Sequence, residues 1–246
     1  LSKLKRIIPI AKELGFIALE PGVTQQDLAE YLEKNNWHYM TPVTGAGPAC
    51  SLVSNTLERG YGITPYTDHF MAASSFRYFL PHPDMCDQEC YSPVASLDKS
   101  VKSGAQRSIV DASYKWGIGP NFDGMLTQSN LAVVSEMSLR LAPIPNKFSS
   151  FYIQCKSPKS LKPAVKFIQK LLKEQGANIG SINLMDKRRV VTMVAENPNG
   201  PAAHKVLSDE QVDSIVEQYK LPEWTIVGSI YTTQHTFKSV KKYIKS

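Results

Sequence analysis

The sequence predicts an α+β fold arranged as two consecutive domains. Strand-like apolar runs are interspersed with amphipathic helical segments, and no internal repeat or low-complexity tract is visible. The length of 246 residues suits one large domain or two ordinary ones. A Pro-rich linker at 143–146 separates stretches of different composition, so the expected domains are residues 1–145 and 146–246. A hydrophobic share of 42% predicts packed cores rather than disorder.

The first domain opens with a strand, a second strand and a helix. Arg6–Ile10 and Gly15–Glu20 are apolar runs separated by a polar turn, which is typical of paired strands. Thr24 is in position to cap a helix that continues to about Lys34.

The middle of this domain alternates between loops and strands. Residues 41–69 are rich in Gly, Pro, Thr and Ser without periodicity, and such long loops in compact domains are usually functional. Ala72–Leu80 is strand-like, and residues 81–108 have the polar pattern of a surface excursion. A second Gly-rich stretch, Gly117–Asn130, leads into Leu131–Leu141, where the apolar pattern indicates paired strands.

The second domain is expected to alternate strands and helices. Strands are predicted at Phe148–Cys155, Arg189–Ala195 and Trp224–Tyr231. Helices are predicted after a cap at Ser160 and running to Gly176, after a capping box of Ser208 with Gln211, and from Thr236 onward. This order of elements fits an α+β layer.

The net charge of +6 is concentrated in the second domain. Residues 1–149 hold 13 Lys/Arg and 14 Asp/Glu, whereas residues 150–246 hold 15 and 8. A basic half can attract nucleic acid. However, the lysines of the helix expected at 161–172 fall on a face away from its apolar residues, which favours a solvated helix face over a nucleic-acid site.

Several other classes of site are disfavoured by the sequence. Four scattered cysteines do not form a disulfide framework, which predicts a reduced, cytoplasmic setting. No apolar run approaches the roughly 20 residues that span a bilayer, and neither a Gly-Lys-Ser/Thr phosphate loop nor a Gly-x-Ser-x-Gly elbow is present. His82, Cys86 and Cys90 are four residues apart, but prolines flank His82 and no fourth ligand is evident, so no metal site is expected.

Three stretches carry a resemblance to a known family. Within residues 1–28, a pair of strands ends in a Glu-Pro-Gly-Val-Thr turn, and this turn leads into a helix. The first motif segment, Asn55–His69, has the sequence NTLERGYGITPYTDH, and the second motif segment, Gly119–Pro143, has the sequence GPNFDGMLTQSNLAVVSEMSLRLAP. Together they resemble the FAD-linked oxidases of the p-cresol methylhydroxylase and vanillyl-alcohol oxidase type. Trp224, Gly228 and Tyr231 resemble a strand of the substrate domain of that family.

The resemblance implies a fold and an activity. Residues 1–145 are expected to form part of a FAD-binding domain with a mixed or antiparallel sheet and flanking helices, and residues 146–246 the start of a substrate domain. The family's pyrophosphate-binding loop is expected upstream of Leu1, and the rest of its substrate domain beyond Ser246, so the chain is expected to be a fragment. The implied reaction is hydride transfer from an alcohol, hydroxy acid or phenol-type substrate to FAD.

The resemblance also implies which residues contact the cofactor. Glycines allow the close approach of backbone that a flat flavin needs, and small polar side chains can hydrogen-bond its edge. The implied cofactor-binding residues are Ser51, Asn55, Gly60, Gly62, Thr64, Gly124, Thr127, Asn130, Val133 and Val134. The loop before Asn55 lacks the acidic residue that family members place near the flavin.

Arg59 and His69 are the candidate catalytic residues, because a positive group would stabilise negative charge on the reduced flavin. Each has a structural alternative: Arg59 as the partner of Glu58 or Asp68, and His69 as a hydrogen-bonded core histidine. Asp68 and Asp123 are candidates for simple turn caps.

Three functional hypotheses remain open at this level. In the first, the chain belongs to an active flavoenzyme that is completed by further sequence, a companion segment or a homodimer partner. In the second, it is a truncated, inactive relative with little FAD binding. In the third, it is a basic nucleic-acid-binding module. Flavin binding distinguishes the first from the second, and salt-sensitive nucleic-acid binding would indicate the third.

Overall fold

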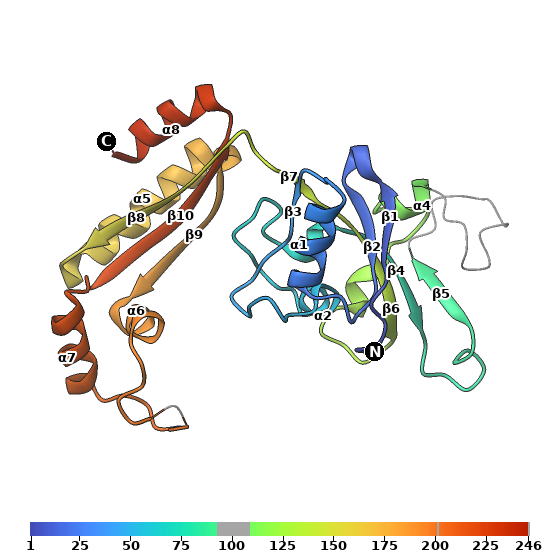
Figure 1. Cartoon of the computed structure of the whole chain (residues 1–246), viewed down its shortest axis with the longest axis horizontal. Coiled ribbons are helices and arrows are strands. Elements are labelled where there is room, and N and C mark those ends of the chain that lie inside the picture. Colours follow the sequence, from blue (N-terminus) through green and yellow to red (C-terminus); the bar gives the residue numbers. More distant parts are fainter. Residues whose placement is uncertain (93–108, 201, 246) are drawn as a thin grey trace. The chain divides into compact units, whose positions relative to one another are not determined.

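A computed structural model describes residues 1–92, 109–200 and 202–245 (Figure 1). The chain divides into two compact units, unit 1 at Leu1–Ile144 and unit 2 at Pro145–Ser246. Both combine helices with antiparallel sheets, so the predicted α+β class is confirmed. The assignment of these units to a FAD-binding domain and a substrate domain stays a prediction.

Unit 1 is organised around a five-stranded antiparallel sheet. Its strand order is β1-β2-β6-β4-β5, with β1 at Ile7–Ala11, β2 at Phe16–Leu19, β4 at Ala73–Phe79, β5 at Glu89–Ser92 and β6 at Val133–Arg140. A second, two-stranded sheet pairs β3 (Tyr39–Met40) with β7 (Ala142–Pro143). The helices are η1 at Lys12–Leu14, α1 at Gln25–Lys34, α2 at Leu52–Leu57, α3 at His69–Ala72, α4 at Ile109–Ser113 and η3 at Asp123–Leu126.

The core of unit 1 lies between this sheet and α1. Ile17, Met137 and Phe76 come from three neighbouring strands and pack with Leu28 of α1 in one buried cluster. The predicted cap is confirmed, since the Thr24 hydroxyl accepts from Asp27 N at 3.1 Å while the Asp27 carboxylate accepts from Thr24 N at 2.9 Å. The opening strands and the strand predicted at Ala72–Leu80 are also confirmed.

Three predictions for unit 1 were wrong. Residues 41–69 were expected to form a loop, but they contain α2, which Ser51 caps by accepting from Ser54 N at 3.2 Å. Leu131–Leu141 does not form paired strands but the single strand β6, which is hydrogen-bonded to β2 on one side and β4 on the other. Its position in the middle of the sheet buries side chains on both faces, and this produces the apolar run. The polar stretch after Leu80 contains the edge strand β5, whose half-buried residues carry little pattern; the remainder of that predicted excursion, residues 93–108, lies outside the described residues.

Unit 2 is built on a three-stranded antiparallel sheet of order β8-β10-β9. The strands are β8 at Lys147–Cys155, β9 at Ile179–Asp186 and β10 at Trp224–Thr232. The helices are η4 at Pro158–Ser160, α5 at Leu161–Gln175, η5 at Gly176–Asn178, α6 at Lys187–Val194, α7 at Asp209–Tyr219 and α8 at Gln234–Lys245. Leu171 of α5 and Val240 of α8 pack with Ile179 and Ile230 in the core of this unit.

The strand predicted at Arg189–Ala195 was wrong, because this stretch forms α6. Its β-branched residues favour a strand locally. The Asp186 carboxylate accepts from Arg189 N at 2.8 Å and caps a helix instead, with Val191 buried beneath it. The strand of this region is β9, immediately upstream.

One helix start was predicted at the wrong residue, and one predicted cap makes no hydrogen bond. Helix α5 is present, but Ser160 makes no capping hydrogen bond, and Ser157 caps the preceding η4 by accepting from Lys159 N at 3.3 Å. Helix α8 begins at Gln234 rather than Thr236.

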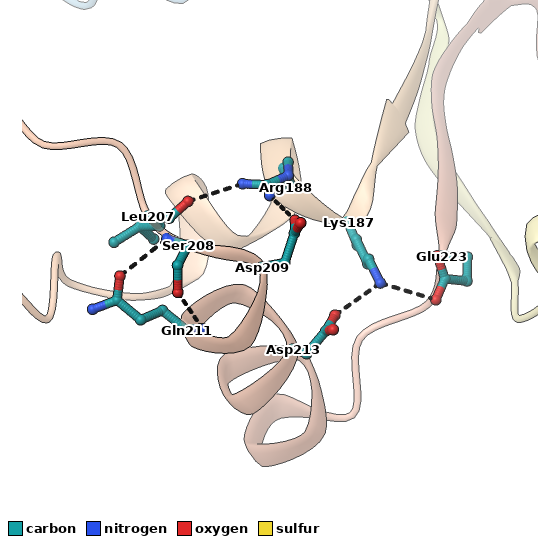
Figure 2. A network of polar contacts seen from close by, with 8 residues as sticks. All are labelled: Lys187, Arg188, Leu207, Ser208, Asp209, Gln211, Asp213 and Glu223. Carbon is teal, nitrogen blue, oxygen red and sulfur yellow. Dashed lines mark hydrogen bonds and ion pairs between the residues drawn. The ribbon is translucent and has the colours of Figure 1, made fainter.

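The predicted capping box of α7 is confirmed within a wider polar network (Figure 2). Lys187, at the start of α6, reaches Asp213 of α7 at 2.9 Å and Glu223 before β10 at 3.4 Å. Arg188 donates to the Leu207 carbonyl at 3.2 Å and pairs with Asp209. These contacts join α6 to the N-terminal half of α7.

Candidate functional site

The two motif segments lie against each other in unit 1. Gln128, in the second motif segment, donates its backbone N–H to the Leu57 carbonyl at 3.0 Å. Its side-chain amide donates to the Glu58 carbonyl at 3.4 Å. Stretches about 70 residues apart in sequence therefore meet at the C-terminal end of α2.

The first motif segment folds around a buried pair, Asn55 and His69. Asn55 Oδ1 accepts from His69 Nδ1 at 2.6 Å, and His69 N donates to the Gly60 carbonyl at 3.2 Å. A Cβ on Gly60 would overlap the Asn55 amide. A Cβ on Gly62 would overlap the Val43 carbonyl oxygen and lie 2.5 Å from His69 Nε2. Both glycines are therefore required by the packing of the segment itself.

His69 is held neutral by its surroundings. Only 3% of it is exposed, and burial lowers the pKa of its imidazole, with the nearby Asp68 charge acting in the opposite direction. Because Nδ1 donates to Asn55, Nε2 is left as an acceptor. Within the part of the chain that the structure describes, neither this Nε2 nor the buried Thr64 hydroxyl has a hydrogen-bond partner. A neutral imidazole does not supply positive charge, so of the two catalytic candidates only Arg59 is a cation here.

Arg59 is paired within the same segment. Its guanidinium lies 3.6 Å from the Asp68 carboxylate and 4.9 Å from the centroid of the Phe70 ring. The carboxylate partner is thus Asp68 rather than Glu58. Asp68 also caps α3, accepting from Phe70 N at 3.0 Å and Met71 N at 3.3 Å, so the turn-cap interpretation of this residue is confirmed.

Lys115 is a site residue that the sequence analysis missed. Its ammonium donates to the carbonyls of Phe70 at 2.6 Å and Ala73 at 2.9 Å and lies 4.7 Å from the Phe70 ring centroid. Burial lowers the pKa of this amine, while Asp123 and Asp68 act to raise it. No motif or periodicity surrounds Lys115, so no sequence signal singles it out.

Asp123, in the second motif segment, is a buried carboxyl rather than a simple turn cap. Ser92 donates its hydroxyl to Oδ1, and Oδ2 has no partner among the described residues. Burial raises the pKa of this carboxyl, with the hydrogen bond from Ser92 opposing the shift. Asp123 lines a cavity of about 160 Å³ together with apolar side chains such as Leu126 and Leu131.

Some of the predicted cofactor-binding side chains are used by the fold. The Ser51 hydroxyl donates to the Pro21 carbonyl at 2.6 Å and accepts from Ser54 N at 3.2 Å as the cap of α2. Thr127 donates to the Gly124 carbonyl at 2.7 Å, and Val134 is buried in the core. These side chains have little left to offer a ligand.

The others are open. Gly124 has empty space where a Cβ would be, Asn130 is exposed, and 47% of Val133 is exposed at the start of β6. The structure thus separates the predicted set into residues committed to packing, an outward-facing group of Gly124, Asn130 and Val133, and Thr64, which is buried with a hydroxyl that has no partner among the described residues.

Unit 2 contains a larger cavity, of about 450 Å³, next to the network of Figure 2. It is lined by α6, α7 and the loop that joins them. Two of the polar residues on its wall are engaged internally: Arg188 with Leu207 and Asp209, and Thr192 with the Arg189 carbonyl. No predicted site residue lines it, and the described residues contain no cluster of His, Cys, Asp and Glu able to hold a metal.

No protein-family model matches the chain. It is 32% identical over 205 residues to 1'-carboxy-chondrochloren decarboxylase of Chondromyces crocatus, covering 83% of this chain and 36% of that protein. It is 31% identical over 153 residues to the flavoprotein subunit of 4-cresol dehydrogenase (hydroxylating) of Pseudomonas putida, covering 62% of this chain and 27% of the relative. The structure of p-cresol methylhydroxylase with substrate bound superimposes on the whole chain with a TM-score of 0.82, at 22% identity and over 45% of that chain.

The fold and these relatives define a class, the FAD-binding flavoproteins. The chain belongs to the FAD-linked oxidase family of the p-cresol methylhydroxylase type. It spans about a third of the length of the curated relatives it matches. Among the described residues, no helix is long and apolar enough to cross a membrane.

Proposed function

We propose that this chain is part of a FAD-dependent oxidoreductase that takes a hydride from a phenol-type, alcohol or hydroxy acid substrate. Unit 1 contributes part of the FAD-binding domain, and unit 2 contributes the start of the substrate domain. The observation that carries the proposal is the contact between the two motif segments through Gln128, because these are the stretches that resemble the family most closely.

The relatives support a phenolic substrate. By its name, the Pseudomonas putida relative acts on 4-cresol, a phenol. It is also named as one subunit of its enzyme, which supports a companion subunit or segment for this chain. The Chondromyces crocatus relative is named for a carboxylated compound, so a carboxylate on the substrate is compatible with the family.

The described residues fit a flavin. Gly124 and Val133 offer backbone and apolar surface open to a flat ring, and the unpartnered His69 Nε2 and Thr64 hydroxyl are buried polar atoms suited to a ligand's hydrogen bonds. When bound, FAD would supply the hydride acceptor. The chain's own part is to orient the ring, exclude water and hold positive charge at Arg59 near it.

The test is a titration of the chain with FAD, followed by quenching of flavin fluorescence. Gly124→Leu is the informative variant, because a Cβ at this position meets no protein atom within 4 Å, so the new side chain should disturb binding only if a ligand approaches there. Gly60 and Gly62 are unsuitable, since substitution at either disrupts the fold. Gly176→Leu in unit 2, also open, is the matched control.

We expect saturable binding that Gly124→Leu weakens about tenfold or more and Gly176→Leu leaves unchanged. Far-UV circular dichroism establishes that each variant is folded. Saturable binding that is indifferent to Gly124→Leu would show that the second motif segment does not contact the flavin. A folded chain that binds no FAD would favour the inactive-relative hypothesis.

A further inference from the structure

A small cavity in unit 1 lies beside the first motif segment. It has a volume of about 190 Å³, roughly that of six water molecules in the liquid, and this suits a single ring or a small polar group. Its walls include Phe16, Tyr66, Met71, Ser74, Lys115 and Arg140. Tyr66 belongs to the first motif segment, and Met71 follows it closely, so the cavity adjoins the predicted site.

The charge of this cavity is entirely positive. Lys115 and Arg140 line it, and no acidic side chain does. Arg140 is exposed and forms no ion pair with any residue of the described ranges; its guanidinium lies 5.8 Å from the centroid of the Tyr66 ring. The hydrogens of the Lys115 ammonium are taken by the Phe70, Met71 and Ala73 carbonyls, so Lys115 contributes charge rather than hydrogen bonds.

Ser74 adds a neutral donor to the same wall. It is buried, and its hydroxyl has no hydrogen-bond partner in the parts of the chain that the structure describes. Arg140 and Ser74 are both available to donate to an anion in this cavity.

Aromatic and apolar side chains form the rest of the walls. Tyr66 has a φ of 63°, in the left-handed region that non-glycine residues seldom adopt, and 40% of the residue is exposed. Strained residues of this kind are found where surrounding structure holds a side chain in a particular place. Phe16 and Met71 add apolar surface to the same cavity.

We propose that this cavity binds a carboxylate carried on an aromatic ring, with Arg140 and Ser74 donating to the carboxylate and the ring lying against Tyr66 and Phe16. The planar fork of an arginine matches the two oxygens of a carboxylate. The ligand's identity as the substrate rests on the proposed function, whereas binding itself does not.

The experiment is calorimetric titration of the chain with 4-hydroxybenzoate and with its neutral analogue 4-hydroxybenzamide. We expect the carboxylate to bind about tenfold tighter or more, since a charged hydrogen-bond partner is worth at least that factor. Arg140→Gln should remove the difference, and Ser74→Ala should reduce it. Arg189→Gln, an exposed arginine in unit 2, is the matched control and should change nothing.

Equal binding of acid and amide, no binding of either, or a preference that survives Arg140→Gln would each overturn the proposal. Inorganic phosphate binding as tightly as 4-hydroxybenzoate would also overturn it, because the aromatic walls would then have no role. FAD and 4-hydroxybenzoate titrations of the unsubstituted chain separate the two proposals. In that chain, normal FAD binding without carboxylate binding would refute only the cavity's role, and carboxylate binding without FAD binding would refute only the flavin site.

Discussion

His69 is a buried histidine whose imidazole has a lowered pKa, and this has a consequence for stability. Below about pH 6.5, the ordinary value, the unfolded chain binds a proton at this position that the folded chain does not. The free energy of unfolding of unit 1 should therefore fall as the pH drops through 6.5, by about 1.4 kcal/mol for each unit of depression. NMR titration of the imidazole and urea unfolding at pH 7.5 and 5.5 measure the two quantities.

The control for this prediction is His69→Gln, which removes the imidazole and should abolish this part of the pH dependence. An imidazole of His69 that titrates at 6.5 or above would contradict the prediction. It would also mean that Nε2 of His69 is not an unprotonated acceptor without a hydrogen-bond partner among the described residues.

Gly62 and Gly124 are glycines for different reasons, and alanine substitution distinguishes them. A Cβ at Gly62 would meet the Val43 carbonyl and His69 Nε2, so Gly62→Ala should destabilise unit 1 by about 1–3 kcal/mol. A Cβ at Gly124 meets open space, so Gly124→Ala should leave stability unchanged or slightly raised. Urea denaturation of both variants measures the difference. Similar stability of the two would show that the first motif segment can shift to accept a side chain.

The site could be predicted from the sequence only where its residues lie within one segment. The pattern from Asn55 to His69 is continuous, so its glycines could be recognised and Arg59 could be assigned a carboxylate partner, Glu58 or Asp68, of which the structure has Asp68. Lys115 reaches carbonyls more than 40 residues away, and Ser92 donates to a carboxylate 31 residues away. Contacts of this range depend on how the strands pair, and no local pattern encodes them.

At the scale of elements, a residue in the N-cap position stabilises its helix through its side chain only where that side chain accepts a hydrogen bond from the first turn. Thr24 makes a capping box for α1, whereas Ser160 makes no capping bond for α5. Thr24→Ala should therefore cost about 1 kcal/mol of stability, within the usual range for a lost cap, and Ser160→Ala less than about 0.5 kcal/mol. Urea unfolding measures both. A comparable loss for Ser160→Ala would mean that its hydroxyl caps the helix in solution.

Strands and helices were predictable where the local pattern agreed with the packing. The cap of α1 at Thr24 and the strand at Phe148–Cys155 were both predicted from the local sequence and are both present in the structure. The valines of α6 favour a strand by propensity, but Asp186 caps a helix and Lys187 and Arg188 tie that helix to α7 (Figure 2). These last contacts are tertiary, and they decide the outcome in a stretch whose local preference is for a strand.

At the scale of the whole molecule, each unit has its own hydrophobic core. The cluster of unit 1 includes Ile17, Leu28 and Phe76, and that of unit 2 centres on Leu171 and Val240. A polypeptide with two separate cores is expected to unfold in two steps when neither core depends on the other.

Leu171→Ala tests this expectation, because Leu171 is fully buried in α5 and its truncation leaves a cavity. We expect a loss of about 2–5 kcal/mol confined to one of two transitions. The measurement is urea unfolding followed by tryptophan fluorescence. Trp37 and Trp116 report on unit 1, and Trp224, the first residue of β10, reports on unit 2. Phenylalanine replacement of Trp224 removes the fluorescence of unit 2 and so assigns each transition to its unit. Ile17→Ala is the reciprocal variant and should lower only the transition of unit 1. A single transition lowered by both variants would show that the two units unfold together, and unit 1 could then not be studied as a flavin-binding domain apart from unit 2.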